Sequence, residues 1–320
     1  MFHLRLVPDN TRIPFMKGRH AGILLSVLLS LASVVLFFYP GLNYGIDFAG
    51  GIVIEARTQE ATDFSKMRTV LHDLNMGSVS LQEFGSANDV LIRLERQPGD
   101  DAVQQKAADR VRATLAQEFP GTQVRRVEAV GASVSGELFR SGMLALGLAI
   151  VAMLVYIWFR FEWQFGAGAV VTLLLDVTKT VGFYVLFDLQ FNLTAIAAIL
   201  TIMGYSINDK VVVYDRMREN LRIYKKMPLR ELIDLSINET LNRTLGTSLA
   251  TLLSILPLAI FGGEALEEFG IVLIFGIFLA TSSSIFIAAP ILLFLGENRL
   301  RRGTAPAEST TPGTQPQQAP

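Results

Sequence analysis

Two ionisable residues, Asp209 and Lys210, stand side by side inside a long apolar stretch in the second half of the chain. Asn208 precedes them, and a run of valines follows at once. If this stretch crosses a membrane, each buried charge costs about 2.5–3.5 kcal/mol to insert. Because such a cost is seldom met without a purpose, ionisable groups in membrane segments are functional candidates by default.

The two neighbouring apolar stretches also contain ionisable residues. Asp176 and Lys179 lie about one helical turn apart in the preceding stretch, so they share a helix face near its middle. Arg243 stands at the beginning of the following stretch. Because successive membrane helices run in opposite directions, Asp209 and Arg243 are expected at a similar depth and are predicted to be partners. Intramembrane ionisable groups of this kind are functional candidates.

Each of these residues also has a structural interpretation. Lys179 and Lys210 have long stems that reach toward the membrane surface or pair with neighbouring acids. Arg243 is typical of the basic residues that flank a membrane helix, and Asp176 has a local partner in Lys179. Asp209 favours function most clearly, because its short side chain cannot reach the surface and apolar residues follow it.

Long apolar runs place these charges in the membrane. Of 320 residues, 51% are hydrophobic and 18% are charged, whereas soluble domains are about 25% charged. A run of roughly 17–25 apolar residues is long enough to cross a bilayer. Six runs of about this length are predicted to be helices, over 21–39, 138–159, 165–187, 192–214, 244–261 and 269–295.

The Lys and Arg residues predict how these helices are oriented. They gather before the first helix, between the second and third, between the fourth and fifth, and after the sixth. The short connections 188–190 and 262–268 contain neither residue. Because cytoplasmic loops carry the excess of basic residues, both termini are expected in the cytoplasm.

The long segment 41–136, between the first and second helices, is predicted to be an exported domain. Its patterns indicate a strand at 50–58, a helix at 61–75, strands at 79–84 and 90–96, a helix at 100–119 and a strand at 123–130. This β-α-β-β-α-β order is the ferredoxin-like arrangement. Near its start, the glycines of GIDFAGG (45–51) indicate a tight turn, within which Asp47 is expected to form a hydrogen bond.

The predicted fold class is therefore a multi-pass α-helical membrane protein with six transmembrane helices and an exported α+β ferredoxin-like domain between helices one and two. The predicted divisions are a cytoplasmic segment 1–20, a transmembrane helix 21–40, a periplasmic domain 41–136, a five-helix membrane domain 137–296 and a cytoplasmic tail 297–320. The tail is rich in Thr, Pro, Gln and Ala and is expected to be disordered.

The composition excludes several enzymatic functions. The chain has no cysteine, so it has no thiol nucleophile, cysteine-ligated metal or disulfide. None of its three histidines belongs to an H-E-x-x-H motif, and no phosphate-binding G-x-x-x-x-G-K-[ST] loop occurs. We therefore expect no enzymatic activity, cofactor or metal. The basic run 216–230 fits a membrane flank beside anionic lipid better than a nucleic-acid site.

Four stretches carry a resemblance to a known family. NYGIDFAGG (43–51), RFEWQFGAGAVV (160–171), GYSINDKVVVYDRMREN (204–220) and ETLNRTLGTSLATLL (239–253) resemble the signature stretches of the SecF family. Its members are membrane subunits that work with SecD beside the SecYEG protein-export channel, and they belong to the proton-driven resistance-nodulation-division (RND) type. The resemblance runs from about 43 to 295, in the order and topology that the family shows.

The resemblance implies a function in the inner membrane. Such a protein uses the proton motive force, together with SecD, to promote late steps of polypeptide translocation. Together with the pattern of charges, it assigns proton coupling to Asp209, Arg243 and Asp176 and a supporting role to Asn208, Lys210, Thr247, Ser248 and Lys179. The implied partners are SecD, SecYEG, accessory membrane subunits, the translocating preprotein and membrane lipids, without nucleic acid.

Two positions depart from the family pattern. Lys210 stands where many relatives have threonine, and Leu175 stands where many have histidine before the acid of the third helix.

Two alternative functions remain open. One is an RND-type transporter half for small molecules or lipids, although such transporters usually carry two six-helix halves and larger exported domains. The other is a passive scaffold of the translocase, against which the buried charges argue.

The charge asymmetry predicts the topology. A phosphatase that is active only outside the cytoplasm should be active when fused after Gln97 or Glu264 and inactive when fused after Lys226. The measurement is phosphatase activity in intact cells, normalised to the amount of each fusion. An active fusion at Lys226 would overturn the six-helix arrangement.

Overall fold

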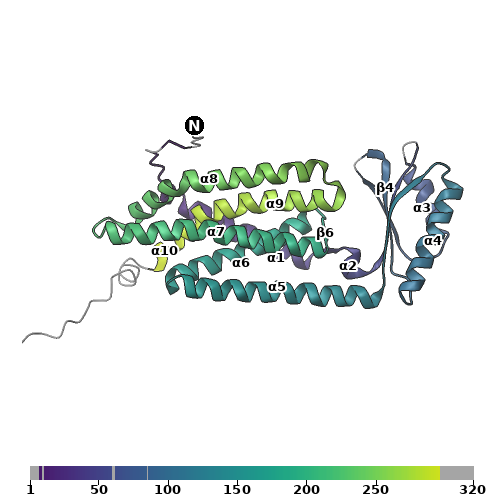
Figure 1. Cartoon of the computed structure of the whole chain (residues 1–320), viewed down its shortest axis with the longest axis horizontal. Coiled ribbons are helices and arrows are strands. Elements are labelled where there is room, and N and C mark those ends of the chain that lie inside the picture. The colour runs from purple at the N-terminus through teal and green to yellow at the C-terminus, as the bar shows by residue number, and fades with distance from the viewer. Residues whose placement is uncertain (1–6, 9–10, 60–61, 85, 296–320) are drawn as a thin grey trace, which may run out of the picture.

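The fold has two parts, a bundle of long helices and a smaller α+β domain at one end of it (Figure 1). The computed structural model describes residues 7–8, 11–59, 62–84 and 86–295, so the predicted tail 297–320 lies outside the described residues.

Within the described residues, six spans are long and apolar enough to cross a membrane. The spans are α1 (Arg19–Phe38), α5 (Ala132–Arg160), α6 (Trp163–Leu186), α7 (Leu193–Ile223), α8 (Leu229–Phe261) and a last one made of α9 (Gly263–Ser283), the π-helical turn η2 (Ser284–Ala288) and α10 (Ala289–Leu295). A short 3₁₀ turn, η1 (Phe15–Lys17), precedes α1. The predicted fold class is confirmed.

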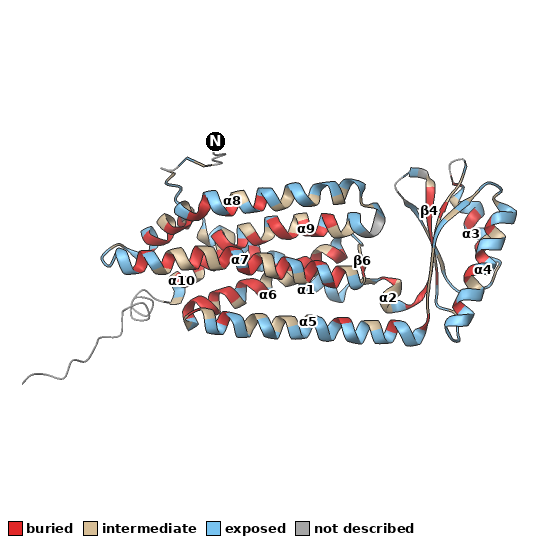
Figure 2. Cartoon of the chain, in the orientation of Figure 1, coloured by how far each residue is buried: buried red, intermediate tan, exposed pale blue. Residues whose placement is uncertain are grey.

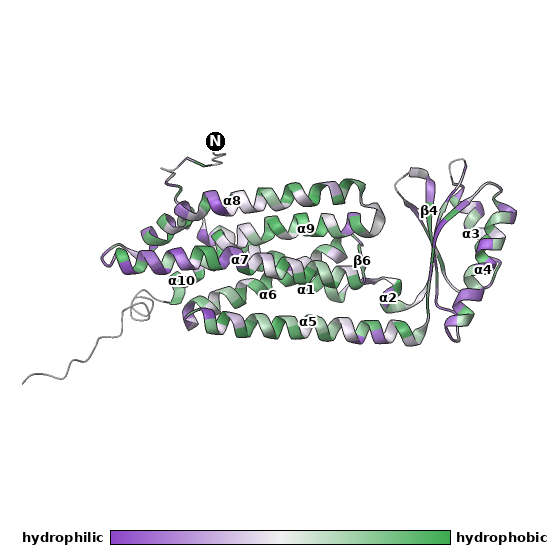
Figure 3. Ribbon diagram, in the orientation of Figure 1, coloured by the Kyte–Doolittle hydropathy of each residue, from purple (hydrophilic) through white to green (hydrophobic). Residues whose placement is uncertain are grey.

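Helices α7 and α8 extend beyond their apolar runs. The sequence predicted helices over 192–214 and 244–261, whereas α7 ends and α8 begins inside the polar segment between these ranges. The polar extensions pair with each other, since Arg216 of α7 forms an ion pair with Glu239 of α8 at 2.8 Å. Hydropathy alone marks only the part of each helix that lies in lipid. Figure 3 shows the hydrophilic residues gathered at the α7–α8 turn and over the α+β domain.

Helix α7 is among the most buried spans of the bundle. It packs against α6, α8 and α9. Figure 2 shows buried residues along α6, α7 and the start of α8, while α5 is largely exposed. The buried polar side chains in the middle of α7, Ser206, Asp209 and Lys210, are therefore surrounded by other helices.

Helix α1 packs on α6 through small side chains. Its buried residues are Ser26, Ser30 and Ser33, while most of its leucines are exposed. The two helices approach closely at Gly182 of α6, where an added Cβ atom would lie 2.4 Å from the Ser33 Cβ. Small residues at helix contacts are typical of membrane proteins, because lipid solvates the large apolar side chains outside.

The α+β domain has the predicted ferredoxin-like order. Its elements are β2 (Gly51–Arg57), α3 (Phe64–His72), β3 (Val79–Phe84), β4 (Ser86–Leu94), α4 (Asp101–Glu118) and β5 (Gln123–Val130). The strands form one antiparallel sheet in the order β3-β4-β2-β5. Alternate residues such as Ile52, Ile54 and Ile92 are fully buried in the core shared with α3 and α4. Helix α3 begins later than the predicted 61–75, because the Asp63 side chain caps it and accepts two backbone hydrogen bonds.

A short neck connects the two parts: β1 (Asn43–Tyr44), α2 (Ile46–Ala49) and β6 (Gln190–Phe191), which pairs in parallel with β1. The expectation that Asp47 bonds within its own turn is corrected here, because its carboxylate accepts a hydrogen bond from the Leu193 amide at 3.0 Å. That amide belongs to the first turn of α7, where backbone N–H groups lack intrahelical partners.

The glycines of the neck are needed as predicted. Gly50 and Gly51 have φ of 72° and 120°, and a Cβ on Gly51 would lie 2.7 Å from the Leu94 carbonyl oxygen.

Asp89 of β4 ties three strands together. It lies opposite Arg57 of β2, which bonds its carboxylate at 2.5 and 2.6 Å. Arg125 of β5, the extra residue of a β-bulge, lies 3.5 Å from the same carboxylate. The hydrogen bond from Arg57 is the largest cause that lowers the pKa of Asp89, to about 2.

We predict that Asp89→Asn destabilises the sheet by about 1–2 kcal/mol at neutral pH. A carboxylate whose folded pKa is lowered contributes stability above its ordinary pKa of about 4 and loses it as the pH falls toward the folded value. The difference in stability between wild type and variant should therefore disappear as the pH falls from about 4 to about 2. Hydrogen exchange of the β2 and β4 amides in the full chain measures this. Asp109→Asn, which alters an exposed acid of α4, is the matched control, and equal exchange in the two variants at neutral pH would refute the prediction.

Candidate functional site

Four charged side chains are buried in the membrane helices that the structure describes. Asp176 and Lys179 come from α6, and Asp209 and Lys210 come from α7. Each is at most 5% exposed. Helical spacing places Asp176 and Lys179 on one side of α6, and packing of α6 on α7 brings Lys210 beside Asp176. Asp209 directly precedes Lys210 on α7 and meets Thr281 of α9 instead. With both acids ionised and both lysines protonated, the cluster is formally neutral.

Asp176 is the centre of this cluster. Its Oδ1 lies 3.5 Å from Lys179 Nζ, and its Oδ2 lies 3.1 Å from Lys210 Nζ. The hydroxyls of Ser206 and Ser283 donate to the same Oδ2 at 2.8 and 2.7 Å. The sequence predicted only the local partner Lys179. The structure adds a closer lysine from α7 and hydroxyls from two further positions, so Asp176 joins three helices.

The two lysines are held inside the bundle. Lys179 Nζ also donates to the hydroxyl of Ser26 on α1 at 2.9 Å. Lys210 Nζ donates to the hydroxyl and the backbone carbonyl of Ser206, and to the Ser283 hydroxyl at 3.4 Å. Of the two structural interpretations of these lysines, pairing with a buried acid is therefore the one that is observed. Such bonds offset the large free-energy cost of burying an ammonium group.

Asp209 has a much weaker set of partners. Among the described side chains, the Thr281 hydroxyl donates to its Oδ2 at a long distance of 3.4 Å. Thr281 shares a hydrogen bond of 2.8 Å with Ser248 of α8, and the Tyr205 hydroxyl donates to Ser248 at 2.8 Å. A hydroxyl chain thus runs from Tyr205 to a carboxylate that is only 2% exposed. The charge of Asp209 is the least firmly held in the cluster.

The predicted pairing of Asp209 with Arg243 is not made in this structure. Arg243 is exposed on α8, and no ion pair among the described residues joins it to Asp209. Ser248 points at α7, where it meets Tyr205. Five residues separate Arg243 from Ser248, which turns their side chains about 140° apart on a helix. Similar depth on successive helices is therefore not sufficient for pairing, because the two side chains must also face each other.

The other expected polar residues divide between the inside and the outside of the bundle. Ser248 belongs to the hydroxyl chain, as described. Asn208 and Thr247 are exposed, and the Thr247 hydroxyl donates to the Thr244 carbonyl of its own helix at 2.9 Å. Leu175 precedes Asp176 and adds no polar atom to the cluster.

Sequence reasoning missed several hydroxyl residues of the site. Ser206 lies three and four residues before Asp209 and Lys210, a spacing that shares their helix face and could have revealed it. Ser283 and Thr281 gave no comparable signal, because they stand in the Ser/Thr-rich stretch 281–284 of the last span. Directly after Ser283, the helix widens into the π-helical turn η2. Such turns are frequent at functional sites.

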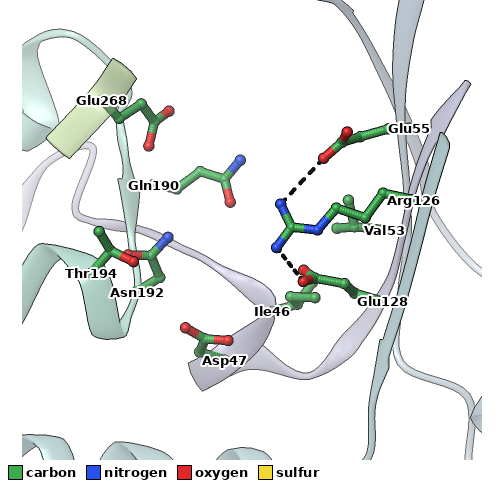
Figure 4. Close-up of a pocket in the computed structure, with 10 residues that line it drawn as sticks. All are labelled: Ile46, Asp47, Val53, Glu55, Arg126, Glu128, Gln190, Asn192, Thr194 and Glu268. Carbon is green, nitrogen blue, oxygen red and sulfur yellow. Dashed lines mark hydrogen bonds and ion pairs between the residues drawn. The ribbon is translucent and has the colours of Figure 1, made fainter. Parts of the chain in front are cut away.

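A second polar crevice lies between the neck and the α+β domain (Figure 4). Within it, Arg126 of β5 pairs with Glu55 at 3.4 Å and with Glu128. These charges are satisfied within one sheet and lie partly in solvent, so they lack the isolation that would couple a proton to a rearrangement. No group of three or more His, Cys, Asp and Glu side chains among the described residues could hold a metal ion.

Sequence relatives align with this chain almost from end to end. Protein translocase subunit SecF of Rickettsia bellii is 44% identical over 303 residues, which cover 94% of this chain and 99% of the relative. Protein translocase subunit SecF of Rickettsia felis is 45% identical over 303 residues, covering 94% of this chain and 98% of the relative.

Solved structures share the fold. The crystal structure of SecDF, a translocon-associated membrane protein from Thermus thermophilus, matches 91% of this chain with a TM-score of 0.81 and 33% identity. A SecDF structure in a super-membrane-facing form matches 94% with a TM-score of 0.61 and 31% identity. This chain spans only 39% and 40% of those two SecDF chains.

Two family descriptions match the sequence directly. The SecD/SecF GG motif matches residues 35–62, which include the neck glycines and Asp47. The C-terminal part of the protein export membrane protein SecD/SecF matches residues 110–298, which include every charged residue of the buried cluster. The chain therefore belongs to the SecD/SecF family of protein-export membrane proteins.

Proposed function

We propose that this chain is the SecF subunit of a protein translocase, which works with SecD and uses the proton motive force to promote late steps of polypeptide translocation. The observation that carries the proposal is the buried cluster of Asp176, Lys179, Asp209 and Lys210 in a chain that matches SecF subunits over almost their whole length. Such a cluster is costly in a bilayer, and its titration supplies a means of using a proton gradient.

Asp209 is the proposed proton carrier because its charge is the least firmly held. Protonation of Asp209 changes the formal charge of the cluster from zero to plus one. Lys210, the next residue, then loses a neighbouring negative charge while Asp176 still holds it at 3.1 Å. Helices α6, α7 and α9 readjust around the changed charge. A charge that crosses the full membrane potential gains about 2.3 kcal/mol per 100 mV, which is enough to bias such a change.

The outer surface of α7 and α8 supports SecD as the partner. Thr201 and Asn208 of α7 and Arg243, Thr247 and Ser254 of α8 are exposed. They flank the seam where Tyr205 meets Ser248 and would otherwise face lipid. Polar groups in a membrane are expected to face another protein surface, and a related half supplied by SecD would cover them. Arg243 is then proposed to act at this interface or to reach Asp209 in another conformation.

The proposed orientation places both termini in the cytoplasm and the α+β domain outside. The basic α7–α8 turn lies at the end of the bundle opposite to the α+β domain, which supports this orientation (Figures 1 and 3). The exported domain would meet the emerging preprotein. SecYEG and accessory membrane subunits are the further proposed partners.

An RND-type transporter half for small molecules or lipids is a weaker alternative. The matches to SecF cover 98–99% of those relatives. The transporter alternative rests only on the fact that such transporters and the SecF family belong to the same proton-driven RND type. A passive scaffold is the other alternative, and it leaves the weakly bonded carboxylate of Asp209 without a role.

The proton-coupling role of Asp209 predicts the behaviour of Asp209→Asn. The amide keeps the size and hydrogen bonding of the acid but cannot titrate, so the complex should assemble normally and lose most of the gradient-stimulated export. The measurement is precursor export into membrane vesicles at fixed ATP, with and without an imposed proton gradient. Asp73→Asn, which changes an exposed acid of the α+β domain, should respond like wild type. If Asp209→Asn also responds like wild type, the passive scaffold becomes the better account.

The contacts of Asp176 predict that this acid contributes to the stability of the bundle. Asp176→Asn leaves Lys179 and Lys210 buried without their ion-pair partner, which costs about 3–5 kcal/mol when a buried pair is broken. We therefore expect lower thermal stability of the purified chain, measured by size-exclusion chromatography after heating. Adding Lys210→Met should restore part of the loss, because it removes one unpaired charge. Wild-type stability of Asp176→Asn alone would contradict the central place given to this acid.

A further inference from the structure

The helices α5 and α6 form a hairpin whose closed end lies away from the α+β domain (Figure 1). A crevice of about 600 Å³ separates them near this end. Ile157, Phe161 and Gly166 are buried and form part of its walls. Trp158 and Trp163 stand at the rim and are 77% and 54% exposed. The crevice has the size of a typical ligand site, which is roughly 300–1,000 Å³.

The crevice exists because α5 stands apart from the bundle. The buried residues of this long helix are Ser135, Gly142 and Ile157. On α6, Gly166 has no side chain and Ala167 has only a methyl group at the gap. Since water requires several polar partners in a cavity and these walls are almost entirely apolar, the crevice suits a hydrocarbon chain better than water.

Arginine side chains adjoin the apolar crevice. Arg160 joins the two regions, because its guanidinium lies 5.1 Å from the ring centre of Phe161, which lines the crevice. Arg160 also lines a second pocket of about 530 Å³ together with Arg218 and Arg222 of α7. An apolar slot therefore continues into a basic pocket at the end of the membrane spans.

The guanidinium groups in this pocket are not fully matched by carboxylates. Asp215 is shared between Arg160, which bonds it closely, and Arg218, which lies 3.9 Å away. Glu162 lies 3.7 Å from Arg218. Both distances to Arg218 are long for ion pairs. The Nε of Arg218 is buried and has no hydrogen-bond partner among the described residues.

Arg222 increases the excess of positive charge. No ion pair of Arg222 occurs within the described part of the chain, although it lines the same pocket. The other acid of the pocket, Glu219, is engaged by Arg216 at 2.6 Å. Arg218 and Arg222 thus line a pocket in which no carboxylate of the described residues binds either of them closely.

We propose that the crevice and the arginine pocket form one binding site for an anionic phospholipid. An acyl chain lies between α5 and α6, and the headgroup phosphate accepts hydrogen bonds from Arg218 and Arg222. The rim tryptophans lie at the level of the headgroups, where their amphipathic rings are favoured. Basic pockets between membrane helices are suited to anionic headgroups, and here the crevice next to the pocket supplies the place for the chain.

The test uses native mass spectrometry of the purified full chain, stripped of lipid and titrated with phosphatidylglycerol or phosphatidylcholine of identical chains. Arg222→Gln should weaken phosphatidylglycerol binding about fivefold, the equivalent of about 1 kcal/mol for one basic residue, and should reduce the preference for the anionic lipid. Ala167→Phe fills the crevice and should weaken both lipids. Lys226→Gln removes an exposed charge outside the pocket and should leave binding unchanged.

Three results would overturn the proposal. Equal losses in Arg222→Gln and Lys226→Gln would mean that the lipid responds only to general basic charge. Unchanged binding in Ala167→Phe would remove the crevice as the acyl site. Displacement of the lipid by millimolar inorganic phosphate would show that the pocket binds free phosphate and that the acyl chain contributes nothing. Since all three concern lipid binding alone, they are independent of export activity.

Discussion

The free-energy cost of removing charged side chains from water determines which residues can pack at the centre of this protein. Asp176 and Lys210, each 1% exposed, bond each other and two serine hydroxyls, because a charged side chain in such a place needs bonded partners to offset its desolvation. This requirement explains why α7 lies among α6, α8 and α9 and why small hydroxyl residues occur where apolar ones would pack more tightly. It also leaves Asp209 as the exception, a buried carboxylate with a single long hydrogen bond from a described side chain. A site of this kind combines a rigid part with a part that can change charge.

Helix α7 connects this cluster to the rest of the chain. Its middle carries Asp209 and Lys210, and the Leu193 amide in its first turn donates a hydrogen bond to Asp47 of the neck. A rearrangement around the cluster that shifted α7 would therefore reach the neck through a continuous helix. Beyond the neck, the crevice around Arg126 separates the α+β domain from the bundle (Figure 4). In the proposed mechanism, this is the route by which a change of charge in the membrane moves the domain outside it.

The sequence predicted the elements well and the contacts between them less well. Apolar length located the six spans, and alternation located the strands, because both patterns report directly on what each residue faces. The pairing of Asp209 with Arg243 failed since depth along a helix says nothing about its face. The role of Ser283 could not be predicted, because a serine beside other serines has no distinguishing pattern and its importance depends on the packing of α9 against α6. Asp47 illustrates the same limit, since its partner, Leu193, is far away in the sequence.

The central claim is that Asp209 changes its protonation state inside the membrane. Infrared difference spectroscopy of the lipid-reconstituted complex, recorded as the pH is changed, observes carboxylic acid groups directly. The account predicts a protonated-carboxyl band that appears and disappears with pH in wild type and is absent from Asp209→Asn. A spectrum in which wild type and Asp209→Asn show the same pH-dependent carboxyl bands would contradict it.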